Sequence, residues 1–119
     1  MILKFRAWDK ETKNLNGMAE FYRNRKQEIE LRPRDENIII MQSTGLHDED
    51  GIEIFEGDVI RWSYFEDSGR AKVIFDKGMF MLLDIRTGKD VWDNLFDCLE
   101  KCDVYFQGNI YENPELLEK

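Results

Sequence analysis

Six carboxylates and the only histidine of the chain lie within residues 42–60, QSTGLHDEDGIEIFEGDVI, a stretch that holds no lysine or arginine. Such a concentration of oxygen and nitrogen ligands could bind a divalent cation or support acid–base catalysis. The seven side chains are His47, Asp48, Glu49, Asp50, Glu53, Glu56 and Asp58. The elements around them decide whether they can converge on a common ligand.

An EF-hand calcium loop does not fit this stretch. With Gly51 at the sixth loop position, Leu46 falls at the first position and Gly57 at the twelfth, where the loop needs its anchoring oxygen ligands. A transition-metal site would have His47 as its single imidazole. The chain therefore lacks the ligand spacing of a known calcium or zinc motif, and we expect no metal site and no cofactor.

Turn chemistry accounts for the same residues more simply. The pair Asp50–Gly51 is preferred in hairpin bends, and Glu56–Gly57–Asp58 fits a bulge that redirects a strand at the corner of a barrel. We interpret the stretch as a turn and a strand kink and expect no catalytic residues. The alternative hypothesis is a metal-dependent enzyme that uses His47, Asp48, Asp50 and Asp58.

The two cysteines, Cys98 and Cys102, are four residues apart and so share a helical face or straddle a helix end. Two thiols and one remote histidine cannot complete a tetrahedral zinc site in a monomer, so we expect small buried apolar residues. A metal shared across an oligomer interface stays open. Without a disulfide framework, a signal peptide or a bilayer-spanning run, the sequence favours a reduced, cytoplasmic setting and no membrane.

The charge is distributed unevenly along the 119 residues, whose net charge is −8. Residues 1–40 hold nine basic and seven acidic side chains, whereas residues 41–119 hold eight basic and eighteen acidic ones. An acidic protein repels nucleic-acid phosphates over most of its surface. Nucleic-acid binding is therefore the alternative function, and it would use the basic segment 23–34, with Arg23, Arg25, Lys26, Arg32 and Arg34.

Hydrophobic periodicity predicts a mainly β protein that forms a small barrel. Strands are expected at residues 3–8, 15–22, 27–32, 38–42, 58–65, 70–75, 79–85 and 103–110, with turns at 66–69 and 76–78. The strand at 38–42 should be buried on both faces, because its apolar run has no polar alternation. Apolar residues at helical spacing predict one helix over 90–101, with Asp90 as N-cap, and Pro114 favours a terminal helical turn.

Three segments together resemble the YopX family of small bacteriophage and prophage proteins. They are residues 3–13 (LKFRAWDKETK), 41–60 (MQSTGLHDEDGIEIFEGDVI) and 108–117 (GNIYENPELL), whereas residues 14–37 and 61–107 depart from the family pattern. The resemblance implies an SH3-like barrel at the C-terminal side and a protein of unknown function, with no catalytic or cofactor residues to transfer. We expect a strand-rich segment at 1–43 and the SH3-like barrel domain at 44–119, with the helix inserted.

The aromatic side chains could form a platform for stacked bases, but acidic flanks favour packing in the core and at interfaces. They include Trp8, Trp62, Phe75, Phe80, Trp92, Tyr105 and Phe106. We therefore expect a non-enzymatic phage or prophage accessory protein that acts through protein–protein contacts. Its partners would be a second copy of itself, in a homo-oligomer, and a host or phage protein.

Overall fold

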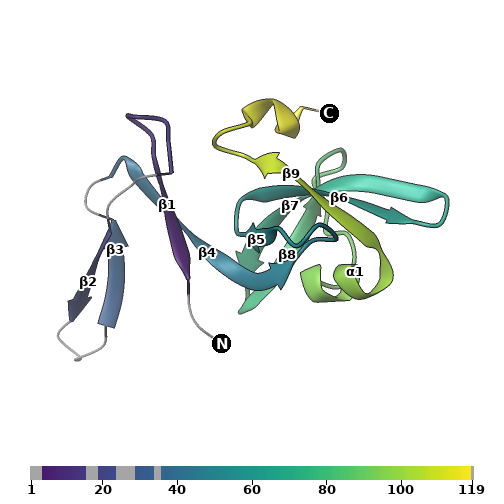
Figure 1. Cartoon of the computed structure of the whole chain (residues 1–119), viewed down its shortest axis with the longest axis horizontal. Coiled ribbons are helices and arrows are strands. Elements are labelled where there is room, and N and C mark those ends of the chain that lie inside the picture. Colours follow the sequence, from purple (N-terminus) through teal and green to yellow (C-terminus); the bar gives the residue numbers. More distant parts are fainter. Residues whose placement is uncertain (1–3, 16–18, 24–28, 34–35, 119) are drawn as a thin grey trace.

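The protein is mainly β, with one α-helix near its C-terminus, which confirms the predicted fold class (Figure 1). The computed structural model describes residues 4–15, 19–23, 29–33 and 36–118. In chain order the elements are β1 (Phe5–Asp9), β2 (Ala19–Arg23), β3 (Ile29–Pro33), β4 (Ile38–His47), β5 (Glu53–Phe55), β6 (Asp58–Tyr64), β7 (Asp67–Asp76), β8 (Met79–Asp84), α1 (Leu95–Lys101), β9 (Asp103–Asn109) and the 3-10 helix η1 (Pro114–Leu117). The helical turn predicted after Pro114 is therefore present.

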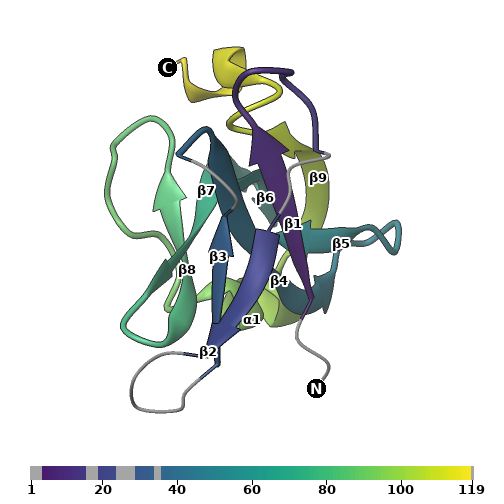
Figure 2. The same ribbon diagram turned by 90° about the vertical axis from the view of Figure 1, so that its left-hand side faces the viewer.

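The long strand β4 joins the two parts of an elongated molecule that measures 51 × 30 × 26 Å (Figure 1). Its first half pairs antiparallel with β1, and its second half pairs with β5 in the same three-stranded sheet. The hairpin of β2 and β3 forms a separate two-stranded sheet, which lies in front when the molecule is turned by 90° (Figure 2). Strand β4 continues across the expected boundary between residues 43 and 44 without a break. The division into 1–43 and 44–119 stays a prediction.

The core lies on one face of the four-stranded antiparallel sheet, whose strand order is β8-β7-β6-β9. Alternate residues of the strands point to this face, where α1 contributes Leu95 and Cys98. The fully buried or nearly buried strand residues are Ile60, Trp62, Ala71, Val73, Leu82 and Val104. The arrangement is consistent with the expected SH3-like barrel, which itself stays a prediction.

The helix starts five residues later than the sequence pattern predicts. Asn94, not Asp90, is the N-cap, and its side chain accepts a hydrogen bond from the amide of Asp97 at 2.8 Å. Asp90 and Val91 are held at the edge of β8 instead, where Asp90 bridges to Leu83 and the amide of Val91 donates to the carbonyl of Leu82. The predicted helix over 90–101 is thus wrong for its first turn, because Asp90 and Val91 bond to β8 and a bend at Trp92 and Asp93 follows.

Two further expectations need correction. The turn between β6 and β7 is made by Phe65 and Glu66 rather than by residues 66–69, so β7 begins at Asp67. Ile39 and Ile40 are half-buried, so the start of β4 is not buried on both faces. The turn predicted at 76–78 is confirmed, since Lys77 and Gly78 both have positive φ at the tip of the β7–β8 hairpin.

A buried ion pair connects β1 to the start of β6. The guanidinium of Arg6 donates to Asp58, whose side chain is fully buried, and lies 4.5 Å from the centroid of the Phe55 ring. The second carboxylate oxygen of Asp58 accepts the amide of Phe55 at 2.8 Å. Burial raises the pKa of the Asp58 carboxyl, while the Phe55 amide and the Arg6 guanidinium oppose that rise.

We expect Arg6→Met to destabilise the protein by about 3–5 kcal/mol at neutral pH, because it leaves the buried Asp58 carboxylate without its cation. The folded-state pKa of Asp58 already lies above its unfolded value, so ionisation costs stability as pH rises, and losing Arg6 enlarges that cost. The loss should therefore shrink towards about pH 4, where the carboxyl can stay protonated. Urea unfolding followed by tryptophan fluorescence at both pH values measures it.

Lys4→Met is the matched control, because it removes the ion pair that Lys4, the residue before β1, makes with Glu53 on β5. The Lys4 side chain is 60% exposed, so this change should cost less than about 1 kcal/mol. Equal losses for Lys4→Met and Arg6→Met, or a loss for Arg6→Met that does not depend on pH, would contradict the prediction.

Candidate functional site

Asp48, in the middle of the acidic stretch, is a structural turn residue. One carboxylate oxygen accepts the amides of Asp50 and Ile52, each at 2.9 Å, and the other accepts the amide of Phe106 at 2.8 Å. The side chain is almost fully buried. It therefore closes its own turn and caps the outer edge of β9, which leaves this carboxylate little capacity for a metal or a substrate.

Two other carboxylates of the stretch have protein partners of their own. Asp58 is paired with Arg6, and Glu53 accepts from Lys4 at 2.9 Å and from the hydroxyl of Ser43 at 2.6 Å. These hydrogen bonds hold the pKa of Glu53 below its usual value. Both side chains serve the attachment of β1 and β4 to the strands that follow.

The remaining members of the metal-enzyme hypothesis do not converge. His47 and Asp50 are exposed, whereas Asp48 and Asp58 are buried at separate places with separate partners. Among the described residues no group of three or more histidine, cysteine, aspartate or glutamate side chains could hold a metal ion. The observed contacts support the interpretation of the stretch as a turn followed by a kink.

The cysteines are buried in the core on α1 and at its end, as the sequence predicts. Burial raises the pKa of both thiols above the ordinary value, most strongly for Cys98. Thiols that stay protonated are poor nucleophiles and poor metal ligands, so this pair contributes packing rather than chemistry.

The aromatic residues divide into core residues and an exposed chain of rings. Trp8 and Trp62 are buried, which confirms the expectation of core packing for these two. From Trp62 the rings continue outwards: Trp92 lies edge-on to it at 5.3 Å, and Tyr64 lies 5.5 Å from Trp92. This series of rings ends at Phe65, whose side chain is 90% exposed. We call Tyr64, Phe65 and Trp92 the aromatic tip.

Sequence reasoning missed the aromatic tip because it placed Phe65 inside a strand and the turn at 66–69. A strand position would have buried or paired the ring, whereas the observed two-residue turn puts it at the end of a hairpin. The signal was present in the pairing pattern. Counting back from the alternation of β7 brings Tyr64 opposite Asp67 and leaves only Phe65 and Glu66 for the turn.

The comparisons with known proteins give a consistent result. The family model described as YopX protein matches residues 4–118. The chain belongs to the YopX family. A search of curated proteins gave no match.

Two solved structures are similar over almost the whole length. Protein EF1440 from Enterococcus faecalis is 28% identical, with a TM-score of 0.66 and 99% of each chain covered. Protein yopX from Bacillus subtilis is 19% identical, with a TM-score of 0.59 and 96% of this chain and 97% of that chain covered. The second likeness shows the shared fold.

The segments that carry the YopX resemblance meet at one junction in space. Trp8 of the first segment stacks on Tyr111 of the third, with ring centroids 6.3 Å apart. Gly57 of the second accepts the amide of Ile110 at 2.9 Å and has a positive φ of 89°. These three segments therefore join the N-terminal strands to the four-stranded sheet.

The basic segment 23–34 lies only partly within the described residues. Arg23 ends β2 and Arg32 lies in β3, while Arg25, Lys26 and Arg34 lie outside the described residues. Nucleic-acid binding through this segment stays a prediction. No helix within the described ranges is long and apolar enough to cross a membrane.

We expect Asp48→Ala to destabilise the YopX-family fold by about 3 kcal/mol, since it leaves three backbone amides without their charged acceptor. Asp50→Ala removes an exposed carboxylate of the same turn and should change stability by no more than about 0.5 kcal/mol. Thermal unfolding with and without calcium, magnesium, manganese or zinc measures both effects. A large loss for Asp50→Ala, or stabilisation of the wild type by one of these ions, would show that the carboxylates form a metal site.

Proposed function

We propose that this YopX-family chain is a non-enzymatic accessory protein of phages or prophages that acts in the bacterial cytoplasm through protein–protein contacts, self-association among them. The observation that carries the proposal is Phe65, a large apolar side chain with 90% of its surface exposed. Its contact at the tip is with Tyr64, whose ring lies 4.6 Å away.

The backbone of Phe65 supports a role outside folding. Its φ is +54°, a region that glycine or asparagine occupies at lower cost than a bulky residue. Strain of this kind amounts to about 1–3 kcal/mol and is found where function requires a particular side chain. Neither the strained backbone of Phe65 nor its exposed ring stabilises the isolated chain.

The surroundings of Phe65 suit a docking surface. Tyr64, at the end of β6, contacts the Phe65 ring and packs against Trp92, which lies between β8 and α1. Trp92 is in turn fixed against the buried Trp62. Aromatic anchors held in a defined position lose little conformational entropy on binding and dominate the affinity of many interfaces. The opposite end of β7 carries a second apolar tip, where Phe75 and Met79 are each 46% exposed.

We expect Phe65→Asn to abolish self-association while leaving the fold at least as stable as the wild type. Asparagine tolerates positive φ, so the backbone strain falls, and the exposed apolar contact is lost. Analytical ultracentrifugation over a range of micromolar concentrations measures association, and urea unfolding of the monomeric protein measures stability. The wild type should show a concentration-dependent dimer or higher oligomer, and the variant a monomer.

Lys77→Asn is the matched control, because Lys77 also occupies a hairpin tip with positive φ, at +52°. It relieves the same kind of strain without removing an aromatic ring and should associate as the wild type does. A wild type that stays monomeric removes self-association from the proposal. Equal effects of the two asparagine substitutions would remove the aromatic tip as the contact.

A further inference from the structure

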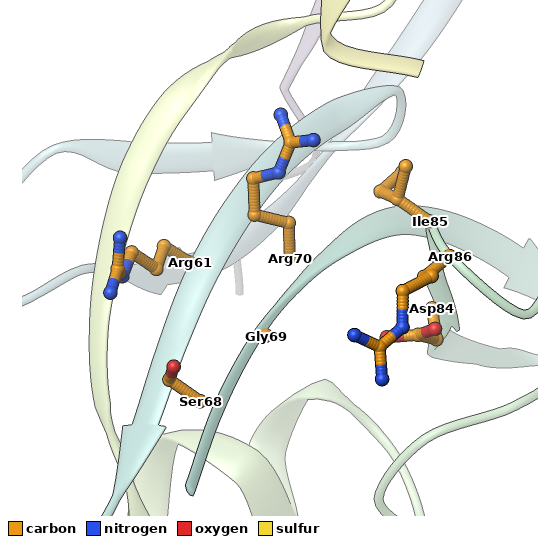
Figure 3. A pocket seen from close by; sticks show the side chains of 7 residues that line it. All are labelled: Arg61, Ser68, Gly69, Arg70, Asp84, Ile85 and Arg86. Carbon is orange, nitrogen blue, oxygen red and sulfur yellow. The ribbon is translucent and has the colours of Figure 1, made fainter. Parts of the chain in front are cut away.

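A hollow on the sheet face opposite the core is lined by three arginines (Figure 3). Its volume is about 270 Å³, and its lining residues are Arg61, Ser68, Gly69, Arg70, Asp84, Ile85 and Arg86. We call it the arginine pocket. Its first lining residue, Arg61, directly follows the acidic stretch in the sequence, and the pocket does not include the aromatic tip.

The sheet register brings the arginines together. Arg61 on β6 lies directly opposite Arg70 on β7, and the carbonyl of Arg70 accepts the amide of Ile85, next to Arg86. These three are all the arginines of residues 41–119, where acidic side chains outnumber basic ones by eighteen to eight. Like charges directly opposite each other destabilise a sheet, so their presence here has no explanation in folding.

The arginine side chains have few partners of their own. Within the part of the chain that the structure describes, Arg61 and Arg86 form no ion pair, and Arg70 donates to the backbone carbonyl of Glu118 at 3.1 Å. The single carboxylate of the lining, Asp84, accepts the amide of Thr87 at 2.8 Å. The guanidinium groups of Arg61 and Arg86 therefore keep their donors available for a ligand.

The guanidinium groups stand apart, as Figure 3 shows: that of Arg70 points away from that of Arg61, and that of Arg86 extends over the Asp84 side of the hollow. This separation lowers the repulsion among the three positive charges. An anion bound between them would instead attract all three guanidinium groups. Exposed arginine side chains change rotamer readily, so the heads can converge without a backbone movement.

The floor of the pocket is backbone. A Cβ at Gly69 would lie 2.9 Å from the Trp62 ring on the core side, so a larger residue would displace that tryptophan. Gly69 thus leaves room for Trp62 on the core side, and its backbone is what it contributes to the lining of the pocket. Ser68 adds a hydroxyl at the rim, a group that can donate to a ligand oxygen.

We propose that the arginine pocket binds the phosphate group of a small phosphomonoester. Three arginines and one aspartate give the lining a formal charge of +2, which matches the charge of about −1.5 to −2 that a phosphomonoester carries at neutral pH. Guanidinium groups present paired donors to phosphate oxygens, and three of them offer more donors than a carboxylate can accept. This assignment is independent of the aromatic tip.

The same charges favour a small ligand over a nucleic-acid strand. A strand would extend its repeated phosphates beyond the pocket, over a protein whose net charge is −8 and whose nearby residues include Asp67 and Glu118. A single phosphate would meet only the arginines. The hollow has room for the phosphate and part of the group that carries it.

The test is a titration followed by NMR of the backbone amides and the arginine Nε–H groups, at low salt, with methyl phosphate, adenosine monophosphate, acetate and a thymidine oligonucleotide as probes. We expect saturable shifts at Ser68, Gly69 and the three arginines with both phosphomonoesters. Arg61→Gln and Arg86→Gln should each weaken methyl phosphate binding by about tenfold or more, the effect of one lost charged hydrogen bond. Arg61→Gln should also raise the thermal midpoint of the free protein, which separates lost binding from lost folding.

Lys72→Gln is the control, since Lys72 lies two residues from Arg70 on the same face of β7 and does not line the pocket. It removes one charge and should change the affinity less than twofold. Absence of saturable shifts, equal affinity for acetate, or equal losses in Lys72→Gln would each overturn the proposal. Tighter binding of the oligonucleotide than of the monoesters would overturn it in favour of a nucleic-acid surface.

Discussion

The ion pair between Arg6 and Asp58 is the contact on which the arrangement of the two parts of the molecule depends. It joins residues that are 52 positions apart and places the charge of Asp58 where its carboxylate is fully buried. A buried carboxylate is tolerable only with partners on its oxygens, and Arg6 and the Phe55 amide supply them. The Arg6–Asp58 ion pair therefore holds β1 to the start of β6, because without Arg6 the Asp58 carboxylate would be buried and unpaired. β1 is also held by its pairing with β4.

Around this pair the chain concentrates its most restrictive packing. A side chain at Gly57 would be strained, since a Cβ would lie 3.0 Å from the Met41 sulfur and the φ of Gly57 is +89°. Gly108 is restricted in the same way, because a Cβ there would lie 2.5 Å from the side-chain oxygen of Asn113. Both glycines belong to segments by which the chain resembles the YopX family. The glycines of these segments are therefore explained by the close packing at the junction.

Sequence patterns were sufficient for strands and insufficient for the places where strands end. Alternation predicted β1, β6, β7 and β8 to within a few residues, because one face of each strand packs on apolar neighbours. The helix start failed because Val91 pairs with Leu82, a contact that no local pattern contains. The β6–β7 turn failed because a bulky residue, Phe65, takes the positive φ that glycine normally signals.

The errors at strand ends had a direct effect on the candidate sites. A turn placed at 66–69 removes Ser68 and Gly69 from β7 and hides both the exposed ring of Phe65 and the pairing of Arg61 with Arg70. The acidic stretch could be interpreted correctly because its chemistry is local: Asp48 binds amides two and four residues ahead. A cluster made by register across strands has no such local signature.

The protein is acidic overall, but the charged side chains that are available to a ligand are arginines. Acidic residues give the chain its net charge of −8, yet Asp48, Glu53 and Asp58 are engaged with amides, a hydroxyl and two cations of the protein itself. Among the described residues, two of the scarcer arginines, Arg61 and Arg86, have no carboxylate partner. These carboxylates are occupied within the scaffold, whereas charge that is left without a partner at a hollow is available to a ligand. The residues most open to binding therefore lie outside the acidic stretch, while the residues that first suggested chemistry hold the scaffold together.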